Sequence, residues 1–364
     1  MDGISSVKSA AEWRFYLSTD EAWEAMYQDC ANAKKSIEVE QYILEKDALG
    51  RKFLELFIKK AEEGIRVFVV CDKFGSFALH GSRIIRRLRR KGARFYFYHP
   101  ITYLTLLTPW RWFPRTHVKT LLVDETIVYA GGVCIAARMK GWRDTQIRIT
   151  GPIAAQVRVA FHNLEQSFKR KRKRSLPERI TLEGEFTYLQ NRPKAERYLI
   201  YDELIRGIGS AEKYIYISTA FFAPNKQFRR LITEAAQKGV EIRLLVPDHS
   251  DVPFADWVCL SYAQALMDAG VRMYHYKPAV LHNKTMIIDD RWATVGSTNM
   301  DVLSFFHNRE SNVVITHKEA VLQLKDHFMN DLKSSELLTA NVLAQKPAWK
   351  IAMGYLGRIL KVFY

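Results

Sequence analysis

The segment HVKTLLVDETIVYAGG at residues 117–132 returns as HNKTMIIDDRWATVGS at residues 282–297. In both copies the first glycine follows the histidine by fourteen residues. A single H-x-K triplet with a downstream aspartate arises by chance in a chain of this length, whereas two copies in matched register are hard to obtain by accident. The repeat therefore predicts an active site that contains two histidines, His117 and His282.

Longer matched stretches precede both copies. A glycine followed by a β-rich apolar run occurs at Gly64 and Gly92 in the first half, and at Gly239 and Gly270 in the second. This pattern is typical of a helix C-terminus followed by a buried strand. We expect the preceding helices at about 47–63, 79–91, 225–238 and 256–269. Strands that alternate with helices predict an α/β fold whose sheets are covered on both faces.

Each His-Lys strand leads into an acidic turn, Asp124-Glu125 or Asp289-Asp290, and then into another apolar run. This order predicts a hairpin that ends on the glycines. The chain is therefore interpreted as two copies of one lobe. We assign residues 1–168 to the first lobe, 169–182 to a polybasic linker, 183–345 to the second lobe and 346–364 to a basic amphipathic helix.

Composition narrows the choice of partners. The 364 residues include 55 Lys and Arg against 39 Asp and Glu, a formal charge of +16, which favours an anionic partner or surface. The four cysteines lie far apart without a C-x-x-C pair, so neither a zinc site nor a disulfide framework is expected. The N-terminus is too polar for a signal peptide, and no apolar run approaches the length of a bilayer. We expect a soluble or peripheral protein without a metal or other cofactor.

Two facing histidines suit phosphoryl chemistry. One neutral imidazole can attack phosphorus while the other protonates the departing alkoxide. The lysine two residues on projects to the same face of the strand, so Lys119 and Lys284 can supply positive charge to the transition state. At the following turn, Gly132 and Ser297 are expected to let backbone N–H groups approach phosphate oxygens. Two solvated surface strands would not explain the repetition.

The repeated residues resemble the signature of the phospholipase D superfamily, H-x-K-x4-D-x6-G-[GS]-x-N. The second copy fits through Asn299, whereas Cys134 replaces the final Asn of the first copy. The flanks look most like bacterial cardiolipin synthases. The matching stretches are 41–43, 71–76, 142–145, 299–301 and 308–310. The resemblance implies two α/β lobes related by a pseudo-twofold axis, each a mixed β-sheet flanked by helices, with one active site at their interface.

The resemblance also implies a ping-pong transfer through a phosphatidyl-histidine. His117 would be the nucleophile and His282 the general acid and base, although the symmetry of the motifs permits the reverse. Lys119, Lys284 and Asn299 would hold the phosphate. Asp124 and Asp289 complete the signature and are counted with its catalytic residues, although their position favours a role in the turn or at the interface.

Two further acids recur near the motifs. Asp144 lies 27 residues after His117, and Glu310 lies 28 residues after His282. Each is expected in the next strand of its own half. We therefore expect each carboxylate to accept the second ring N–H of the histidine in the same half and to fix its tautomer.

Only the first half carries an apolar, aromatic insert, at about 101–113. We interpret it as a lipid-facing lip of the active site; a lid packed on the protein is the alternative. Its candidate lipid contacts are Trp110, Arg111, Trp112 and Phe113. The run 169–174, an arginine-rich helix at 83–91 and the amphipathic segment 347–364 are further candidates for contact with an anionic leaflet. Solvated faces and docking on the second lobe are the alternatives.

We predict that phosphatidylglycerol donates its phosphatidyl group to His117 and that a second phosphatidylglycerol accepts it, so that cardiolipin and glycerol leave. The expected partners are anionic phospholipids and the membrane surface, at the cytoplasmic face, with no obligate protein partner evident. A hydrolytic phospholipase D is the first alternative. A nuclease of the superfamily and a non-catalytic membrane module are less favoured, since both motifs keep His and Lys and the insert suits acyl chains.

Overall fold

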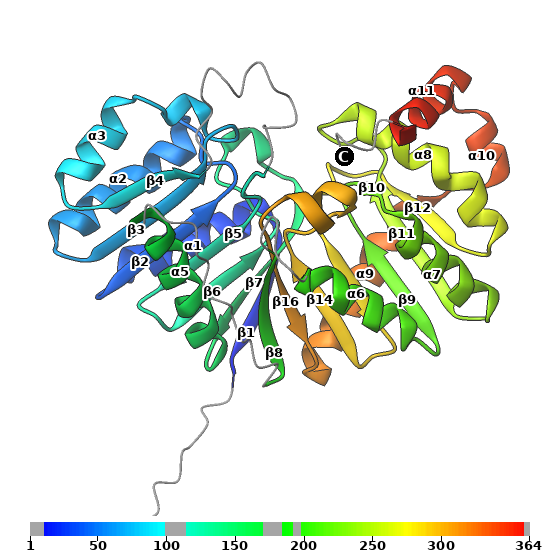
Figure 1. The fold of residues 1–364 in the computed structure, drawn as a ribbon, viewed down its shortest axis with the longest axis horizontal. Coiled ribbons are helices and arrows are strands. Elements are labelled where there is room, and N and C mark those ends of the chain that lie inside the picture. The colour runs from blue at the N-terminus through cyan, green and yellow to red at the C-terminus, as the bar shows by residue number, and fades with distance from the viewer. Residues whose placement is uncertain (1–10, 99–113, 170–183, 192–197, 360–364) are drawn as a thin grey trace, which may run out of the picture.

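A computed structural model describes residues 11–98, 114–169, 184–191 and 198–359. These residues form two α/β lobes that lie side by side (Figure 1). The two halves of the chain repeat one strand order, as the duplicated sequence predicts. In each lobe three parallel strands continue into four antiparallel strands.

The first lobe is built on a seven-stranded sheet of order β1-β7-β6-β5-β2-β3-β4. Its strands are β1 (Trp13–Ser18), β2 (Ser36–Gln41), β3 (Arg66–Asp72), β4 (Arg94–Tyr98), β5 (Lys119–Val123), β6 (Ile127–Gly131) and β7 (Arg143–Thr150). One face packs against α1 (Thr19–Asn32), α2 (Ala48–Glu62) and α3 (Arg83–Arg90). The other face packs against α5 (Ile153–Lys169).

The second lobe contains an eight-stranded sheet of order β17-β12-β11-β9-β13-β14-β16-β8. Its strands are β8 (Phe186–Asn191), β9 (Tyr214–Ser218), β11 (Glu241–Pro247), β12 (Arg272–Tyr276), β13 (Thr285–Ile288), β14 (Trp292–Gly296), β16 (Glu310–Ile315) and β17 (Ser335–Leu337). One face packs against α6 (Leu199–Gly209), α7 (Lys226–Gln237), α8 (Pro253–Asp268) and α10 (Ala340–Ala344), and the other against α9 (Lys318–Lys333). A short parallel pair, β10 (Phe222–Ala223) and β15 (Met300–Asp301), lies beside this sheet.

One hydrophobic core is shared by both lobes. Val128 and Ile147 of the first sheet belong to the same buried cluster as Val295 and Val313 of the second. Burial of apolar surface contributes roughly 25 cal/mol per Å², so this shared core holds the lobes together as one unit. The antiparallel ends of the two sheets therefore meet at the centre of the molecule (Figure 1).

The predicted helices are confirmed. The one at 79–91 is shorter than expected, because residues Phe77–Leu79 form a 3-10 turn and α3 begins only at Arg83. The glycines that precede the buried strands have φ values between 81° and 94°, in the left-handed region that ends helices. These are Gly64, Gly92, Gly239 and Gly270.

The two acidic turns are confirmed as hairpin turns. Asp124 and Glu125 have φ of 51° and 59°, the geometry that matches the twist of a tight hairpin. The Asp124 carboxylate accepts backbone N–H bonds from Lys34, Lys35 and Ser36 at 2.6–3.0 Å, where β2 begins. Although partial burial alone would raise it, these bonds hold the pKa of Asp124 below its usual value. The aspartate thus fixes the start of a neighbouring strand.

Asp289 has the corresponding position in the second lobe. Its carboxylate accepts the N–H groups of Glu212, Lys213 and Tyr214, each at 2.8 Å, at the start of β9. Both aspartates lie at the far end of a strand from the motif histidine. These contacts support the role in the turn that the position of Asp124 and Asp289 favours, and a catalytic role for them stays a prediction. Their carboxylates are occupied by main-chain N–H groups within their own lobes.

The C-terminal helix α11 (Ala348–Ile359) docks on the second lobe through its glycines. A Cβ at Gly354 would collide with the Trp257 carbonyl, and one at Gly357 would press on Val258 and Phe254. The glycine face therefore allows a close approach to α8. The structure confirms a helix here and also its docking. No helix in the described ranges is long and apolar enough to span a bilayer.

We predict that Asp124→Ala lowers the free energy of unfolding by about 1–3 kcal/mol, because three N–H groups lose a charged acceptor. Activity per folded molecule should be retained. Urea unfolding followed by circular dichroism measures the effect, and the exposed Asp326→Ala on α9 is the matched control. If Asp124→Ala keeps full stability but loses turnover, the structural role is contradicted.

Candidate active site

The two motif histidines line one cavity between the lobes. The cavity has a volume of about 480 Å³ and is lined by His117, Lys119, His282 and Asn299, among other residues of both lobes. The His282 side chain is buried and the His117 side chain nearly so, at 7% and 12% exposed. Two segments that lie far apart in the sequence, just before β5 and β13, thus present their histidines to the same space.

Short main-chain bridges between the lobes hold this arrangement. The backbone N–H of His117 donates to the Arg309 carbonyl at 2.8 Å, and the Arg309 N–H donates to the Arg115 carbonyl at 2.8 Å. In the symmetric position, the N–H of His282 donates to the Arg143 carbonyl at 2.8 Å. Each histidine segment therefore pairs with the start of the acid-bearing strand of the opposite lobe.

The carboxylates reach the histidines across the interface. His117 Nδ1 lies 3.0 Å from both Glu310 carboxylate oxygens, and His282 Nδ1 lies 2.7 Å from Asp144 Oδ2. The structure thus confirms that these two acids contact the histidines. The expected pairing within each half is wrong, because the inter-lobe bridges place each acid beside the histidine of the other lobe.

This contact defines the reactive atom of each ring. A carboxylate beside Nδ1 favours the tautomer that carries hydrogen there, which leaves the Nε2 lone pair available. Although Glu310 opposes the effect, burial lowers the pKa of His117 from its usual 6.5 to about 4. Burial and the nearby Lys284 also lower the pKa of His282. Both imidazoles are therefore neutral near pH 7 and able to act as nucleophile or base.

The motif lysines and Asn299 provide the groups that can hold an anion. Lys119 Nζ donates to the His117 carbonyl at 2.7 Å, and Lys284 makes the equivalent bond to His282. Burial, and then the charge of Lys119, lower the pKa of Lys284 to about 8. Asn299 is buried, lines the cavity and has no hydrogen-bond partner for Oδ1 within the described part of the chain. These groups lie where a phosphate would meet the histidines.

Gly132 and Ser297 lie against the carboxylates of Asp144 and Glu310 and do not offer their N–H groups to a phosphate. The Gly132 N–H donates to the Thr145 carbonyl at 3.1 Å, and a Cβ at this position would collide with the Asp144 carboxylate. The Ser297 N–H donates to the Ser311 carbonyl, and its hydroxyl donates to Glu310. The prediction that their N–H groups bind phosphate is wrong, because strand pairing already uses both donors.

The sequence reasoning missed the arginines that anchor the bridges. Arg309 is buried and bonds Glu40 at 2.7 Å, while Arg143 is buried and bonds Asp331 at 2.6 and 2.8 Å. Breaking a buried ion pair is costly, so these contacts resist separation of the bridges. The signal was present: an arginine directly precedes each of the two recurring acids.

Aromatic rings close on the histidines from the first lobe. The rings of Tyr42 and His117 are 5.0 Å apart, and those of Trp142 and His282 are 5.4 Å apart. Cys134 lines the same cavity at the place of the usual Asn. Burial raises the pKa of its thiol, so it stays protonated and is a weak donor. The two half-sites are therefore chemically unequal.

The insert with Trp110, Arg111, Trp112 and Phe113 lies outside the described residues, as does the linker from residue 170 to 183. Within the described ranges, no group of His, Cys, Asp or Glu side chains is arranged to hold a metal ion.

The family model and the similar proteins indicate the same family. The chain matches the family model "Cardiolipin synthase, PLD-like domain" over residues 26–165 and 204–332. It is 33% identical over 349 residues to a cardiolipin synthase of Staphylococcus aureus, covering 92% of this chain and 70% of that protein. A cardiolipin synthase of Oceanobacillus iheyensis is 30% identical over 344 residues, covering 89% and 69%. The phosphatidylserine synthase of Haemophilus influenzae shares the fold, with a TM-score of 0.72 at 14% identity over 97% of this chain and 95% of that one.

We predict that Glu310→Gln changes the ring tautomer of His117, whereas Asp144→Asn changes that of His282. Each variant should also lower kcat, by roughly 10²–10⁴-fold, because the histidine loses its orienting acceptor. Nitrogen NMR of labelled histidines reports the tautomers directly. A change at the histidine of the same half, and not at the opposite one, would contradict the crossed pairing.

The pH profile of kcat, which reports the enzyme with lipid bound, provides a second prediction. Because His117 must be neutral to attack and burial lowers its pKa to about 4, the acidic limb should lie well below 6.5. Lys284 has a pKa of about 8 and is positively charged at lower pH, so activity should fall as the pH rises through that value. Lys284→Arg should move the basic limb upward, and Lys277→Arg, outside this cavity, should not. An unmoved basic limb would exclude Lys284 as its origin.

Proposed function

We propose that this chain, which belongs to the cardiolipin synthase family of phospholipase D-like proteins, joins two phosphatidylglycerol molecules into cardiolipin. Membership of this family makes it a phosphatidyltransferase of the phospholipase D superfamily. The observation that carries the finer proposal is the pair of histidines in one cavity, each held by a carboxylate from the other lobe.

In the first half-reaction, His117 Nε2 attacks the phosphorus of one phosphatidylglycerol. The bond from phosphorus to the head-group glycerol oxygen breaks, and His282 donates a proton to that oxygen, so glycerol leaves. The bound phosphate anion and Asp144 both favour the protonated form of His282 before this step. Lys119, Lys284 and Asn299 stabilise the charge that develops on the phosphate oxygens.

In the second half-reaction, His282 takes a proton from the free hydroxyl of another phosphatidylglycerol. The hydroxyl oxygen attacks phosphorus, the bond to His117 Nε2 breaks, and cardiolipin leaves. The intermediate carries a P–N bond to His117, but over the whole cycle one phosphodiester replaces another, so the chemistry requires no nucleotide to drive it. The tautomer set by Glu310 keeps the Nε2 lone pair of His117 directed at phosphorus in both directions.

The lining of the cavity favours a lipid over water as the acceptor. Ile43, Phe221, Val252 and Leu303 surround the polar centre with apolar side chains. An apolar pocket that excludes water protects a reactive phosphatidyl-histidine from hydrolysis. This supports transfer over a hydrolytic phospholipase D.

The mouth of the cavity supports action at a membrane surface. Phe74 and Val252 both line the cavity and are 58% and 39% exposed. Exposed apolar side chains beside this cavity suit contact with the bilayer interface. Together with the charge of +16, they support peripheral binding to anionic phospholipids, which we place at the cytoplasmic face, over binding to nucleic acid.

The test is incubation of the purified protein with phosphatidylglycerol vesicles in the presence of a chelator, followed by mass analysis of the lipids. We predict cardiolipin and glycerol, with turnover abolished in His117→Ala and in His282→Ala, because nucleophile and acid act as one unit. Rapid quenching should leave a phosphatidyl adduct on His117.

His162→Ala, an exposed histidine on α5, is the matched control and should retain turnover. Phosphatidic acid as the sole lipid product would identify a hydrolase instead. An adduct found only on His282 would reverse the two catalytic roles.

A further inference from the structure

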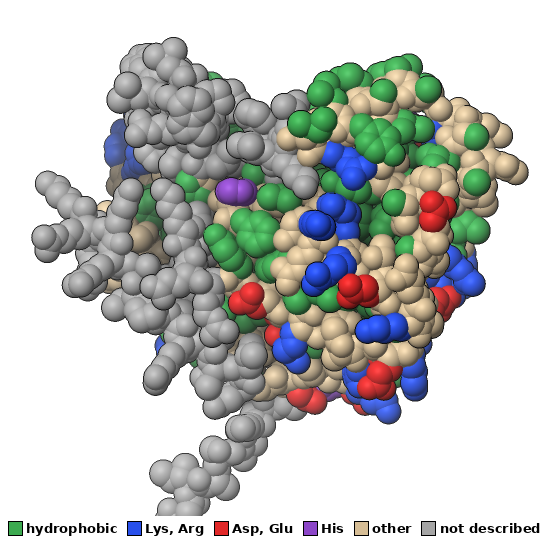
Figure 2. Space-filling view, turned by 45° about the vertical axis from the view of Figure 1, so that its right-hand side comes forward, with side chains coloured by type: hydrophobic (Ala, Val, Ile, Leu, Met, Phe, Trp, Pro, Cys, Tyr) green, Lys and Arg blue, Asp and Glu red, His purple; other side chains and the backbone are tan. Residues whose placement is uncertain are grey.

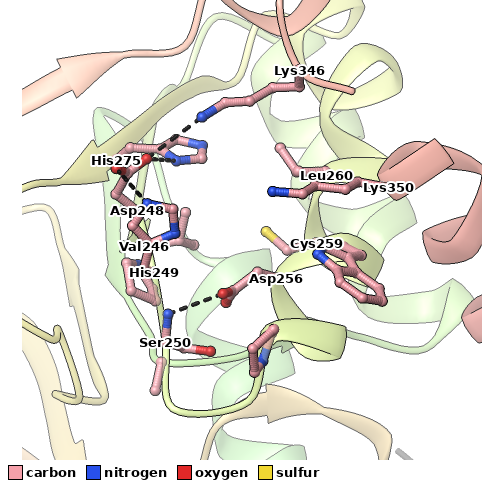
Figure 3. A pocket seen from close by; sticks show the side chains of 14 residues that line it. Val246, Asp248, His249, Ser250, Asp256, Cys259, Leu260, His275, Lys346 and Lys350 are labelled. Carbon is pink, nitrogen blue, oxygen red and sulfur yellow. Dashed lines mark hydrogen bonds and ion pairs between the residues drawn. The ribbon is translucent and has the colours of Figure 1, made fainter. Parts of the chain in front are cut away.

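A second cavity lies in the second lobe, apart from the catalytic histidines (Figure 3). Its volume is about 150 Å³, and it opens where β11 and β12 reach their carboxyl ends, beside α8 and α11. In α/β sheets, ligands bind preferentially at this end of the parallel strands. Ser250 and Pro253 line this cavity, while Asp251 and Val252 line the active-site cavity. One short loop therefore forms a wall of both.

One wall of this cavity offers hydrogen-bond acceptors. His275 is 6% exposed, and neither of its ring nitrogens has a hydrogen bond within the described part of the chain. Its Nδ1 lies 3.3 Å from Asp248 Oδ1, which also lacks a hydrogen bond there. A carboxylate at this distance favours hydrogen on Nδ1, so Nε2 is left as an acceptor. A hydroxyl donor would satisfy His275 Nε2.

The opposite wall offers positive charge. The side chains of Lys346, just before α11, and of Lys350, in its first turn, point into the cavity (Figure 3). Lys346 Nζ lies 3.6 Å from Asp248, at the long end of an ion pair. Lys350 has no carboxylate within ion-pair distance among the described residues. A phosphate placed here would meet two ammonium groups, on the side of a cavity that Asp248 and Asp256 also line.

An exposed apolar stripe continues from this cavity along α11. Trp349, Met353, Leu356 and Ile359 are 55%, 37%, 46% and 79% exposed. The glycine face of the helix is already docked on α8, so this stripe is turned outward. Figure 2 shows hydrophobic side chains gathered at the upper right of the molecule, over this region. An amphipathic helix with lysine at its base suits the boundary of an anionic bilayer.

We propose that this cavity binds the head group of a phosphatidylglycerol other than the one in the active site. Its phosphate would contact Lys346 and Lys350, and a glycerol hydroxyl would donate to His275 Nε2 or Asp248. The acyl chains would follow the apolar stripe of α11 into the bilayer. The choice of lipid rests on the proposed function, while the cation wall, the free Nε2 of His275 and the stripe do not.

Charge and geometry together favour this occupant over a protein. An apolar stripe alone would suit a lipid or a protein partner. A site for an anion at the base of the stripe, next to acceptors for hydroxyl groups, matches a glycerol phosphodiester with attached acyl chains. The shared loop wall, residues 250–253, would hold a second lipid next to the cavity where two lipids must meet.

Acetylation of lysines, read by mass spectrometry, tests the site residue by residue without relying on turnover. Lipid at about ten times its dissociation constant leaves the site free about one-tenth of the time. Phosphatidylglycerol vesicles should therefore slow acetylation of Lys346 and Lys350 about tenfold. Vesicles of phosphatidic acid, which lacks the head-group hydroxyls, should protect them less, and phosphatidylcholine should not protect them. Lys318 and Lys333 on α9 are the internal controls.

Co-sedimentation with vesicles provides the second measurement. Lys346→Gln combined with Lys350→Gln should lose the preference for phosphatidylglycerol over phosphatidic acid. Lys318→Gln combined with Lys333→Gln removes the same charge elsewhere and should keep it. Equal protection by all three lipids would mean unspecific burial of the helix and would overturn the proposal. Full protection by inorganic phosphate alone would assign the cavity to free phosphate and overturn the lipid site.

Cardiolipin formation by the wild-type protein, measured in the same samples, separates the two proposals. Absence of lysine protection while cardiolipin forms would overturn the second lipid site alone. Absence of cardiolipin while protection persists would overturn the proposed function and leave the site.

Discussion

The structure depends on one constraint: each catalytic histidine is held by a carboxylate from the opposite lobe. Glu310 of the second lobe contacts His117, and Asp144 of the first contacts His282. Neither lobe therefore contains a complete half-site. The main-chain bridges from Arg143 and the buried ion pairs beneath them bring the acids to this position. Because each histidine needs a carboxylate from the other lobe, the two repeated lobes together form a single site at their interface.

Burial sets the chemistry of this interface. It keeps both histidines neutral and brings the pKa of Lys284 to about 8, so the site contains bases and weakly held protons near neutral pH. A phosphodiester anion that enters the cavity brings negative charge, which favours the protonated forms of the lysines. The half-sites differ at Cys134, which lines the cavity where the second copy of the motif has Asn299. This difference breaks the symmetry of an otherwise repeated arrangement.

Much of the fold and of the site could be predicted from the sequence, because periodic apolar runs and repeated polar residues report local structure. The helices, the hairpins and both histidines followed in this way. The crossing of Asp144 and Glu310 could not be predicted, since spacing along the chain says nothing about which lobe a side chain faces. The roles of Gly132 and Gly354 also required tertiary contacts: one leaves room for a carboxylate, and the other lets α11 approach α8.

The most direct measurement of the crossed site is a crystal structure of the covalent intermediate, trapped by rapid freezing with phosphatidylglycerol. Phosphorus should be bonded to Nε2 of His117, with Glu310 still on Nδ1 of the same ring and His282 Nε2 facing the vacated leaving-group position. Phosphorus on Nδ1, or a Glu310 carboxylate that contacts His282 instead, would contradict a site assembled by exchange of carboxylates between the two lobes.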